Sequence, residues 1–180
     1  MVYAVFFRNL NLGRRNCPDR RQFEAAFLNA GAGFAESFLT NGTLAFSAVD
    51  AHSAQVILAA ACAELANVCG LKEPAFLRAL PDLARLAALR PFAGVDRSTV
   101  YDCYVTFLHQ DAVIPAGAAL QNSKGDVEVL LVSDLAAMSV VRQLGRSPGS
   151  PNLFMEKMLG LPATTRAWNT LLRLLKKYPL

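Results

Sequence analysis

The chain has 180 residues, 53% of them hydrophobic, and a formal net charge of +4 at pH 7. This length allows one medium domain or two small ones, and the apolar content excludes a wholly disordered chain. No apolar run reaches the roughly 18 residues that span a bilayer. Residues 1–8 have no basic region before their apolar stretch and no small-residue cleavage site after it, so we expect a first strand instead of a signal peptide, and a cytoplasmic protein.

The first half of the chain shows alternating strand and helix signals. Residues 2–7 are apolar at every position, which predicts a strand covered on both faces. Pro18 suits the first position of a helix, and the dipeptide Asn41-Gly42 predicts a hairpin. In chain order we expect a strand at 2–7, a helix from Pro18 to about Gly31, strands at 37–40 and 44–48, a helix from Asp50 or Ser53 to Val68, and a strand at 75–80.

This β-α-β-β-α-β order over about the first 80 residues is the ferredoxin-like arrangement. Its antiparallel sheet would carry both helices on one face. The other face would then need a cover, and the second half of the chain is the candidate.

The second half is less regular. We expect a domain at 1–80, a connecting helix and turn at 81–98, and a second α+β domain at 99–180 that ends in a helix. Its expected elements are a helix at 81–88, strands at 99–108 and 127–132, a helix at 135–144, a loop at 145–151, and helices at 152–159 and 164–177.

The common catalytic signatures are missing from the sequence. His52 and His109 are the two histidines, and the four cysteines form no C-x-x-C pair. Neither a P-loop nor a G-x-G-x-x-G pattern is present. The nearest carboxylate pair on one strand face is Asp126 and Glu128. These features argue against triad hydrolases, zinc enzymes and nucleotide hydrolases, so we expect neither a metal nor a cofactor. They leave open an enzyme that relies on arginine, asparagine and backbone amides.

The basic residues are concentrated at the two ends of the chain. Residues 1–29 carry five basic and two acidic side chains, residues 30–139 carry six and eleven, and residues 140–180 carry seven and one. If the ends meet in space, they form a positive patch on an acidic body. The alternative is that these residues only solvate two exposed helices.

Two loops could hold an anion. Residues 8–16 combine basic and amide side chains with a glycine directly after the first strand, which suits an anion or a nucleotide edge. Arg146 lies beside serines in a glycine-containing loop, where converging amides can hold a phosphate, although Pro148 removes one donor. The alternatives are an ordinary polar connection and a solvated linker.

The C-terminal segment 163–177 is a third candidate. Thr164 or Thr165 could cap a helix whose free amides attract an anion. Trp168, Leu171, Leu172 and Leu175 are expected on its buried stripe, and Arg166, Asn169, Arg173 and Lys176 on its opposite side.

Several segments resemble motifs of domain-of-unknown-function family 1697, a widespread bacterial group. Residues 7–14 look like its leucine-arginine-glycine-isoleucine-asparagine-valine-glycine-glycine signature, and residues 37–46 like its threonine-tyrosine-isoleucine-glutamine-serine-glycine-asparagine hairpin. Residues 164–170 look like its closing threonine-threonine-arginine-asparagine-tryptophan-asparagine-threonine motif, and Arg78 matches an arginine in its fourth strand.

The resemblance implies tandem ferredoxin-like domains, and it implies no function, because none is established for the family. This chain departs from the motifs at Asn9, Arg14, Asn41, Thr43 and Ala167. A site that the family builds there would be altered in this member.

We therefore expect a binding module for an anionic ligand, with nucleic acid as one candidate, that uses the basic patch of the two chain ends. Stacking of bases on the sheet is not supported, because the aromatic strand motif of RNA-recognition domains is missing. The alternatives are an enzyme acting on a small phosphorylated or carboxylated metabolite, and a structural or partner-binding protein without a ligand. A site requires its residues to face one cleft, whereas a structural role requires them to be buried and bonded. The expected ligand-binding residues are Arg8, Asn11, Arg78, Arg146, Thr165, Arg166 and Asn169.

Overall fold

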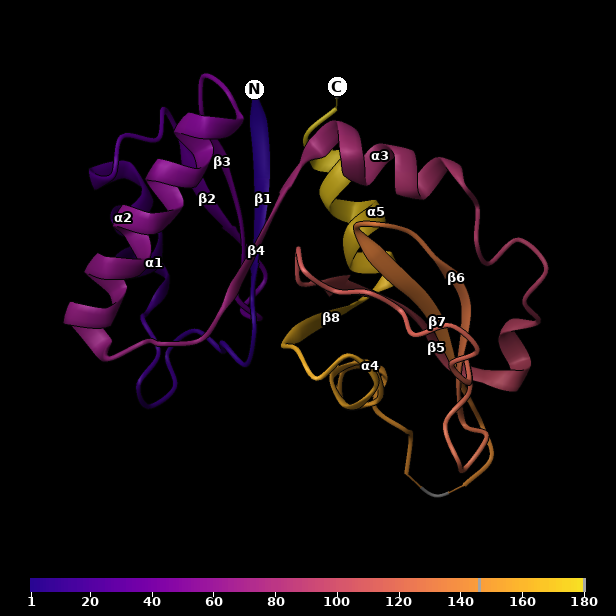
Figure 1. Ribbon diagram of the computed structural model, residues 1–180. Helices are drawn as coiled ribbons and strands as arrows, with labels where there is room; N and C mark the ends of the chain where they lie inside the picture. The colour runs from indigo at the N-terminus through magenta and orange to yellow at the C-terminus, as the bar shows by residue number, and fades with distance from the viewer. Residues whose placement is uncertain (146, 180) are drawn as a thin grey trace. The chain divides into compact units, whose positions relative to one another are not determined.

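The computed structural model describes residues 1–145 and 147–179, and the chain divides into two compact units, Met1–Ala84 and Arg85–Pro179. The protein is α+β: the described residues form two four-stranded antiparallel sheets, one in each unit, and five α-helices (Figure 1). Each unit is described by itself.

The first unit has the strands and helices expected from the sequence, in the same order. Its sheet has the strand order β2-β3-β1-β4, and every neighbouring pair is antiparallel. The elements are β1 (Val2–Phe7), α1 (Arg20–Asn29), β2 (Ala35–Phe38), β3 (Thr43–Ser47), α2 (Ala51–Cys69) and β4 (Ala75–Ala79), followed by α3 (Leu80–Ala88), which crosses the unit boundary.

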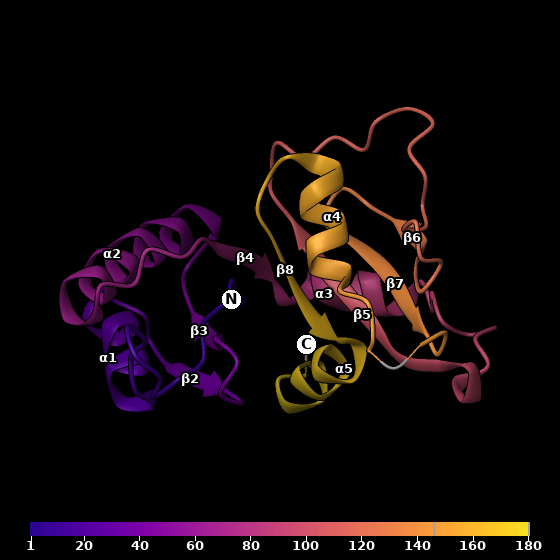
Figure 2. The ribbon, with the colours of Figure 1, turned by 90° about the horizontal axis from the view of Figure 1, so that it is seen from below.

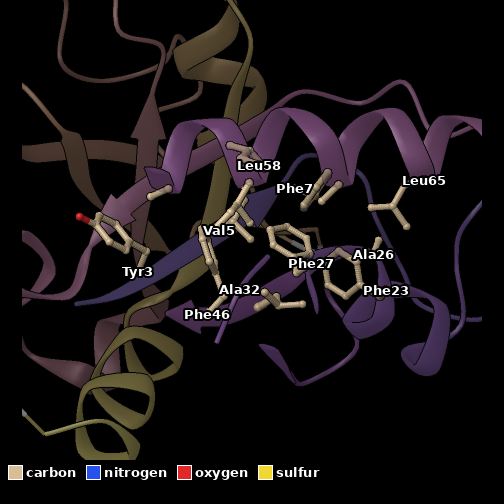
Figure 3. Close-up of a cluster of buried hydrophobic side chains, with 14 of the residues drawn as sticks. Tyr3, Val5, Phe7, Phe23, Ala26, Phe27, Ala32, Phe46, Leu58 and Leu65 are labelled. Carbon is tan, nitrogen blue, oxygen red and sulfur yellow. The ribbon is translucent and has the colours of Figure 1, made fainter. Parts of the chain in front are cut away.

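The core of this unit lies between the sheet and helices α1 and α2, which cover the same sheet face (Figures 1 and 3). Alternate residues of β1 face the helices, because side chains along a strand alternate between the two faces. Phe23 of α1 meets Phe7 edge-to-face, with ring centroids 5.4 Å apart, and Phe27 lies 5.1 Å from Phe46 of β3. The buried centre of this core is formed by Tyr3, Val5, Phe7, Phe23, Phe27, Leu44, Phe46, Leu58 and Leu65.

The helix boundaries follow from capping side chains. Asp19 caps α1 by accepting the Gln22 N–H, while the Gln22 side chain accepts the Asp19 N–H, a reciprocal capping box. The prediction that Pro18 begins the helix was wrong, because this capping box starts the helix two residues later. Asp50, one of the two expected starts, caps α2, and Gly70 ends it with a positive φ of 74°.

The predicted hairpin is present, with a longer connection than expected. Its strands pair at Phe38 and Thr43, and the turn runs over residues 39–42. Gly42 has a φ of 69°, and its carbonyl accepts the Phe7 N–H at 2.8 Å. A Cβ at Gly42 would lie 2.7 Å from the Leu10 Cβ, so the close approach of this loop requires glycine.

Helix α2 revises the expectation that no apolar segment is long enough to span a bilayer. By length and composition alone it could cross a membrane, since it has 19 mostly apolar residues. This is weak evidence, because core helices of globular domains pass the same test. In this structure α2 buries Ala54, Ile57, Ala61 and Leu65 in the core of the first unit.

The second unit has the strand order β6-β7-β5-β8, again with antiparallel pairs throughout. Its elements are β5 (Val100–Leu108), β6 (Val127–Val132), β7 (Ala136–Arg142), α4 (Pro151–Leu159), β8 (Ala163–Ala167) and α5 (Trp168–Lys177), with a short 3-10 turn at Arg97–Thr99. No helix separates β5 from β6 in the described residues, where a long loop takes its place.

Helix α4 covers one face of the second sheet (Figure 2). Met155 is buried there against Leu108 and Ala163, in a small core that also contains Val129 and Ala137. Helix α5 follows β8 directly and contacts β5. Its Trp168 packs edge-to-face on Phe92, with ring centroids 5.1 Å apart.

The predicted helix at 135–144 was wrong, because these residues form β7. This strand lies between β6 and β5, and its residues from Ala136 to Val141 are all buried. A strand buried on both faces has an unbroken apolar sequence, which periodicity cannot distinguish from a buried helix.

The predicted helix at 164–177 begins later than expected. Thr164 and Thr165 belong to β8 and pair with β5, so neither caps a helix, and α5 starts at Trp168 without a side-chain cap. Consecutive β-branched threonines favour a strand. Leu171 and Leu174 are buried on α5, whereas Leu172 is 42% exposed, which corrects the expected stripe.

Candidate functional site

The sequence-predicted residues of the first unit do not come together at one point. Arg8 and Asn11 lie on the loop after β1, whereas Arg78 lies on β4 opposite Ala4, towards the other end of β1. The Arg8 guanidinium pairs with the Glu73 carboxylate at 3.1 Å. The Arg78 Nη1 donates to the carbonyl of its neighbour Leu77 at 2.8 Å.

The predicted residues of the second unit also have different environments. Thr165 and Arg166 lie on β8, Asn169 is exposed on α5, and Arg146 falls outside the described residues. The Thr165 hydroxyl bonds to the Thr106 hydroxyl at 2.8 Å and donates to the Asn152 Oδ1 at 3.2 Å. Thr165 is therefore part of a hydrogen-bond network that joins β5, β8 and α4.

Arg166 is buried, contrary to the expectation of an exposed helix residue. It is 7% exposed, and its Nη1 donates to the Thr164 Oγ1 and to the Thr165 carbonyl, both at 2.8 Å. Burial lowers the pKa of this guanidinium to about 10, since desolvation disfavours its charged form. A buried and bonded arginine is the arrangement expected for a structural role.

The loop between β1 and α1 forms a compact basic surface instead. The Gly13 N–H donates to the Pro18 carbonyl at 2.9 Å, and the Cys17 N–H to the Arg14 carbonyl at 3.0 Å. These bonds close residues 13–18 into a tight loop. Arg14 and Arg15 lie within this loop, and Arg20 and Arg21 follow it in the first turn of α1. We call Arg14, Arg15, Arg20 and Arg21 the basic loop.

The arginines of the basic loop present their charges to solvent. All four are exposed, and within residues 1–145 and 147–179 none of them forms an ion pair. The nearby carboxylate of Asp19 is occupied in capping α1. The guanidinium groups are therefore available to an anion from outside the protein.

The start of α1 adds to this positive charge. Arg20 and Arg21 occupy the first turn of a ten-residue helix that has no acidic residue in that turn. The N-terminal end of a helix carries a partial positive charge, so arginines there are electrostatically unfavourable for the isolated protein. A bound anion would remove this repulsion, and arginine pairs well with phosphate oxygens.

The sequence analysis identified only part of this surface. Arg14 and Arg15 lie within the segment singled out, but Arg20 and Arg21 entered only as part of a charge count. The missed signal was the capping box of Asp19 and Gln22, which places these arginines in the first helical turn.

The candidate acid–base residues show no catalytic geometry. His109 is half-buried near Asp111, 3.5 Å away, while His52 is exposed on the first turn of α2. Glu128 forms an ion pair with Arg142 at 2.6 Å. Among the residues that the structure describes, no three histidine, cysteine or acidic side chains gather as metal ligands.

Comparisons with known proteins give a family and a fold. A family model described as "Protein of unknown function (DUF1697)" matches residues 1–136. The solved structure of the conserved bacterial protein SP0830 from Streptococcus pneumoniae is similar, with a TM-score of 0.65 and 18% sequence identity over 98% of this chain and 97% of that one. No curated protein matches the chain.

Proposed function

We propose that this chain, which belongs to the DUF1697 family of unknown function, binds single-stranded nucleic acid through its basic loop. Single-stranded nucleic acid is a polyanion. The observation that carries the proposal is the group of four exposed arginines, two in the loop before α1 and two in its first turn, that form no ion pair within residues 1–145 and 147–179. Asn11 is exposed on the same loop, where its amide can orient a bound phosphate or base.

A chain of phosphates fits this surface better than a single small anion. The arginines stand in two pairs along the chain, 14–15 and 20–21, and all four are exposed. Contacts of this kind neutralise successive phosphates without reading the sequence. Single strands are favoured because they can bend to follow a short loop.

Three of the other predicted residues have supporting roles in this proposal. Arg8 fixes the base of the loop through Glu73, and Arg166 and Thr165 stabilise β8. We also propose that both units are ferredoxin-like plaits. The strand order β6-β7-β5-β8 repeats the order β2-β3-β1-β4, and the second unit replaces its first helix by a loop. We also propose a cytoplasmic location, where single-stranded nucleic acid is present.

The test is fluorescence anisotropy of a labelled single-stranded oligonucleotide at low salt. The variant R14Q/R15Q/R20Q/R21Q should bind at least tenfold more weakly than the wild type, because each lost charge-assisted contact weakens binding. The matched control K72Q/K124Q/K157Q/K176Q removes the same charge from exposed sites elsewhere and should bind nearly as well as the wild type. Equal loss in the two variants would mean that net charge, and not the basic loop, causes binding.

A further inference from the structure

A cavity in the second unit is separate from the basic loop. It has a volume of about 500 Å³ and opens between the turn at 121–126 and helix α4. This volume lies within the roughly 300–1,000 Å³ of small-molecule sites. The side chains that matter for recognition are Asp126, Lys124, Lys157, Leu153, Phe154 and Met158.

Asp126 is a buried acid in the wall of this cavity. It is 7% exposed, and its Oδ1 accepts one hydrogen bond, from the Asn122 Nδ2 at 2.6 Å. Within residues 1–145 and 147–179 it has no ion pair. A carboxylate can accept about four hydrogen bonds, and a buried charge without a cation is costly. A cationic group of a ligand would provide what this carboxylate lacks.

The surrounding backbone holds Asp126 in place. The Asn122 Oδ1 accepts the Val127 N–H at 3.1 Å, and the Asn122 carbonyl accepts the Gly125 N–H at 2.9 Å. These two hydrogen bonds fix the backbone on either side of Asp126. Gly149 lies against the carboxylate: a Cβ there would be 2.7 Å from the Asp126 Oδ1. The acid is thus positioned before any ligand arrives.

The other side chains that matter in this cavity are basic or apolar. Lys124 and Lys157 are exposed cations without an ion pair among the described residues. Leu153 is 64% exposed, and Phe154 and Met158 continue the apolar wall along the same helix. The cavity therefore offers one buried negative group, two positive groups at the surface, and apolar contact area.

We propose that this cavity binds a small zwitterion with an apolar body, namely a free apolar amino acid or a dipeptide of such residues. The ammonium group of the ligand pairs with Asp126, its carboxylate lies near Lys124 and Lys157, and its side chains pack on Leu153 and Phe154. A purely anionic ligand would leave Asp126 without a partner, and a purely cationic ligand would leave Lys124 and Lys157 without one.

Isothermal titration calorimetry with the dipeptide Leu-Leu tests the proposal on the full chain. N-acetyl-Leu-Leu, which lacks the ammonium group, should bind roughly tenfold more weakly or worse, because its charge-assisted bond to Asp126 is lost. Leu-Leu-amide, which lacks the free carboxylate, should lose less affinity, since the lysines that would pair with that carboxylate lie in solvent. Equal binding of Leu-Leu and its acetylated form, or no binding of either at millimolar concentration, would overturn the proposal.

The variant Asp126→Asn separates recognition from folding. It should abolish the preference for Leu-Leu over N-acetyl-Leu-Leu, while its thermal midpoint without ligand stays equal or rises, because an uncompensated buried charge is removed. Asp134→Asn makes the same charge change at an exposed site outside the cavity and should keep the preference. A preference that survives in Asp126→Asn would contradict the role assigned to this acid.

Discussion

A buried arginine stabilises the terminal strand of the second sheet. Arg166 donates hydrogen bonds to the side chain and main chain of the two preceding threonines, so its charge organises β8 instead of facing a ligand. Its guanidinium is desolvated because the residue is only 7% exposed, and this burial lowers its pKa to about 10. The partners of this charge lie within the protein.

Replacing Arg166 should therefore affect stability. Arg166→Ala leaves the buried Thr164 hydroxyl and the partly buried Thr165 carbonyl without this donor, and we expect it to lower the free energy of unfolding by about 1–3 kcal/mol. Urea unfolding followed by circular dichroism measures the change. Lys176→Ala, on an exposed face of α5, should stay within about 0.5 kcal/mol of the wild type. A similar stability of the two variants would contradict the structural role.

The thiol of Cys62 should be unreactive in the folded protein. Burial raises its pKa to about 11, so the reactive thiolate is scarce at pH 8 and becomes common only as the pH approaches that value. Mass spectrometry after iodoacetamide treatment should show Cys62 unmodified in the native protein and alkylated in urea. Equal alkylation rates in both states would show that the thiol is accessible.

At the residue scale, the sequence indicated which residues carry charge in the candidate sites better than it indicated their surroundings in the fold. It pointed to the arginines of the loop at residues 8–16, because residue type and local spacing carry that information. It misplaced Arg166, since burial there depends on pairing between β5 and β8, strands far apart in the chain. It gave no role to Asp126 beyond a pair with Glu128, because the cavity forms only when α4 packs near the turn.

The connection between β1 and the β2–β3 hairpin supports the basic loop at the element scale. The Phe7 N–H donates to the Gly42 carbonyl at 2.8 Å, and the Leu12 N–H donates to the Thr40 carbonyl at the same distance. The loop is therefore held against the hairpin by backbone bonds, and the glycine that permits this approach should be sensitive to substitution.

Two glycine variants test this arrangement. Gly42→Ala should lower the free energy of unfolding by about 1–3 kcal/mol more than Gly13→Ala, because only the first places a Cβ against Leu10 and Phe7. Both residues have positive φ, so the backbone strain of about 1–2 kcal/mol is common to the pair. Thermal or urea unfolding compares them, and equal losses would show that the close packing is unimportant.

The sequence predicted the elements of the first unit well and those of the second less well. Caps, a hairpin dipeptide and amphipathic stripes are local signals, and they set the order from β1 to β4. Strand β7 was expected as a helix because it is apolar on both faces, and only its pairing with β5 and β6 defines it.

On the scale of the whole molecule, the net charge is small, but part of the positive charge is concentrated in the basic loop. The chain carries 18 basic and 14 acidic residues, yet four of the basic residues lie at one loop and helix start and form no ion pair in the part of the chain that the structure describes. Such a local field attracts anions even when the total charge is modest, and salt screens it over about 10 Å at 0.1 M. The predicted function depends on this distribution.

The salt dependence of oligonucleotide binding tests this account most directly. If the basic loop neutralises about four phosphates of a single strand, the logarithm of the association constant should fall with the logarithm of salt concentration at a slope of about −3. The variant R14Q/R15Q/R20Q/R21Q should bring that slope close to zero. Binding with no salt dependence, a slope unchanged in the variant, or no binding at low salt would contradict a phosphate-binding role for the basic loop.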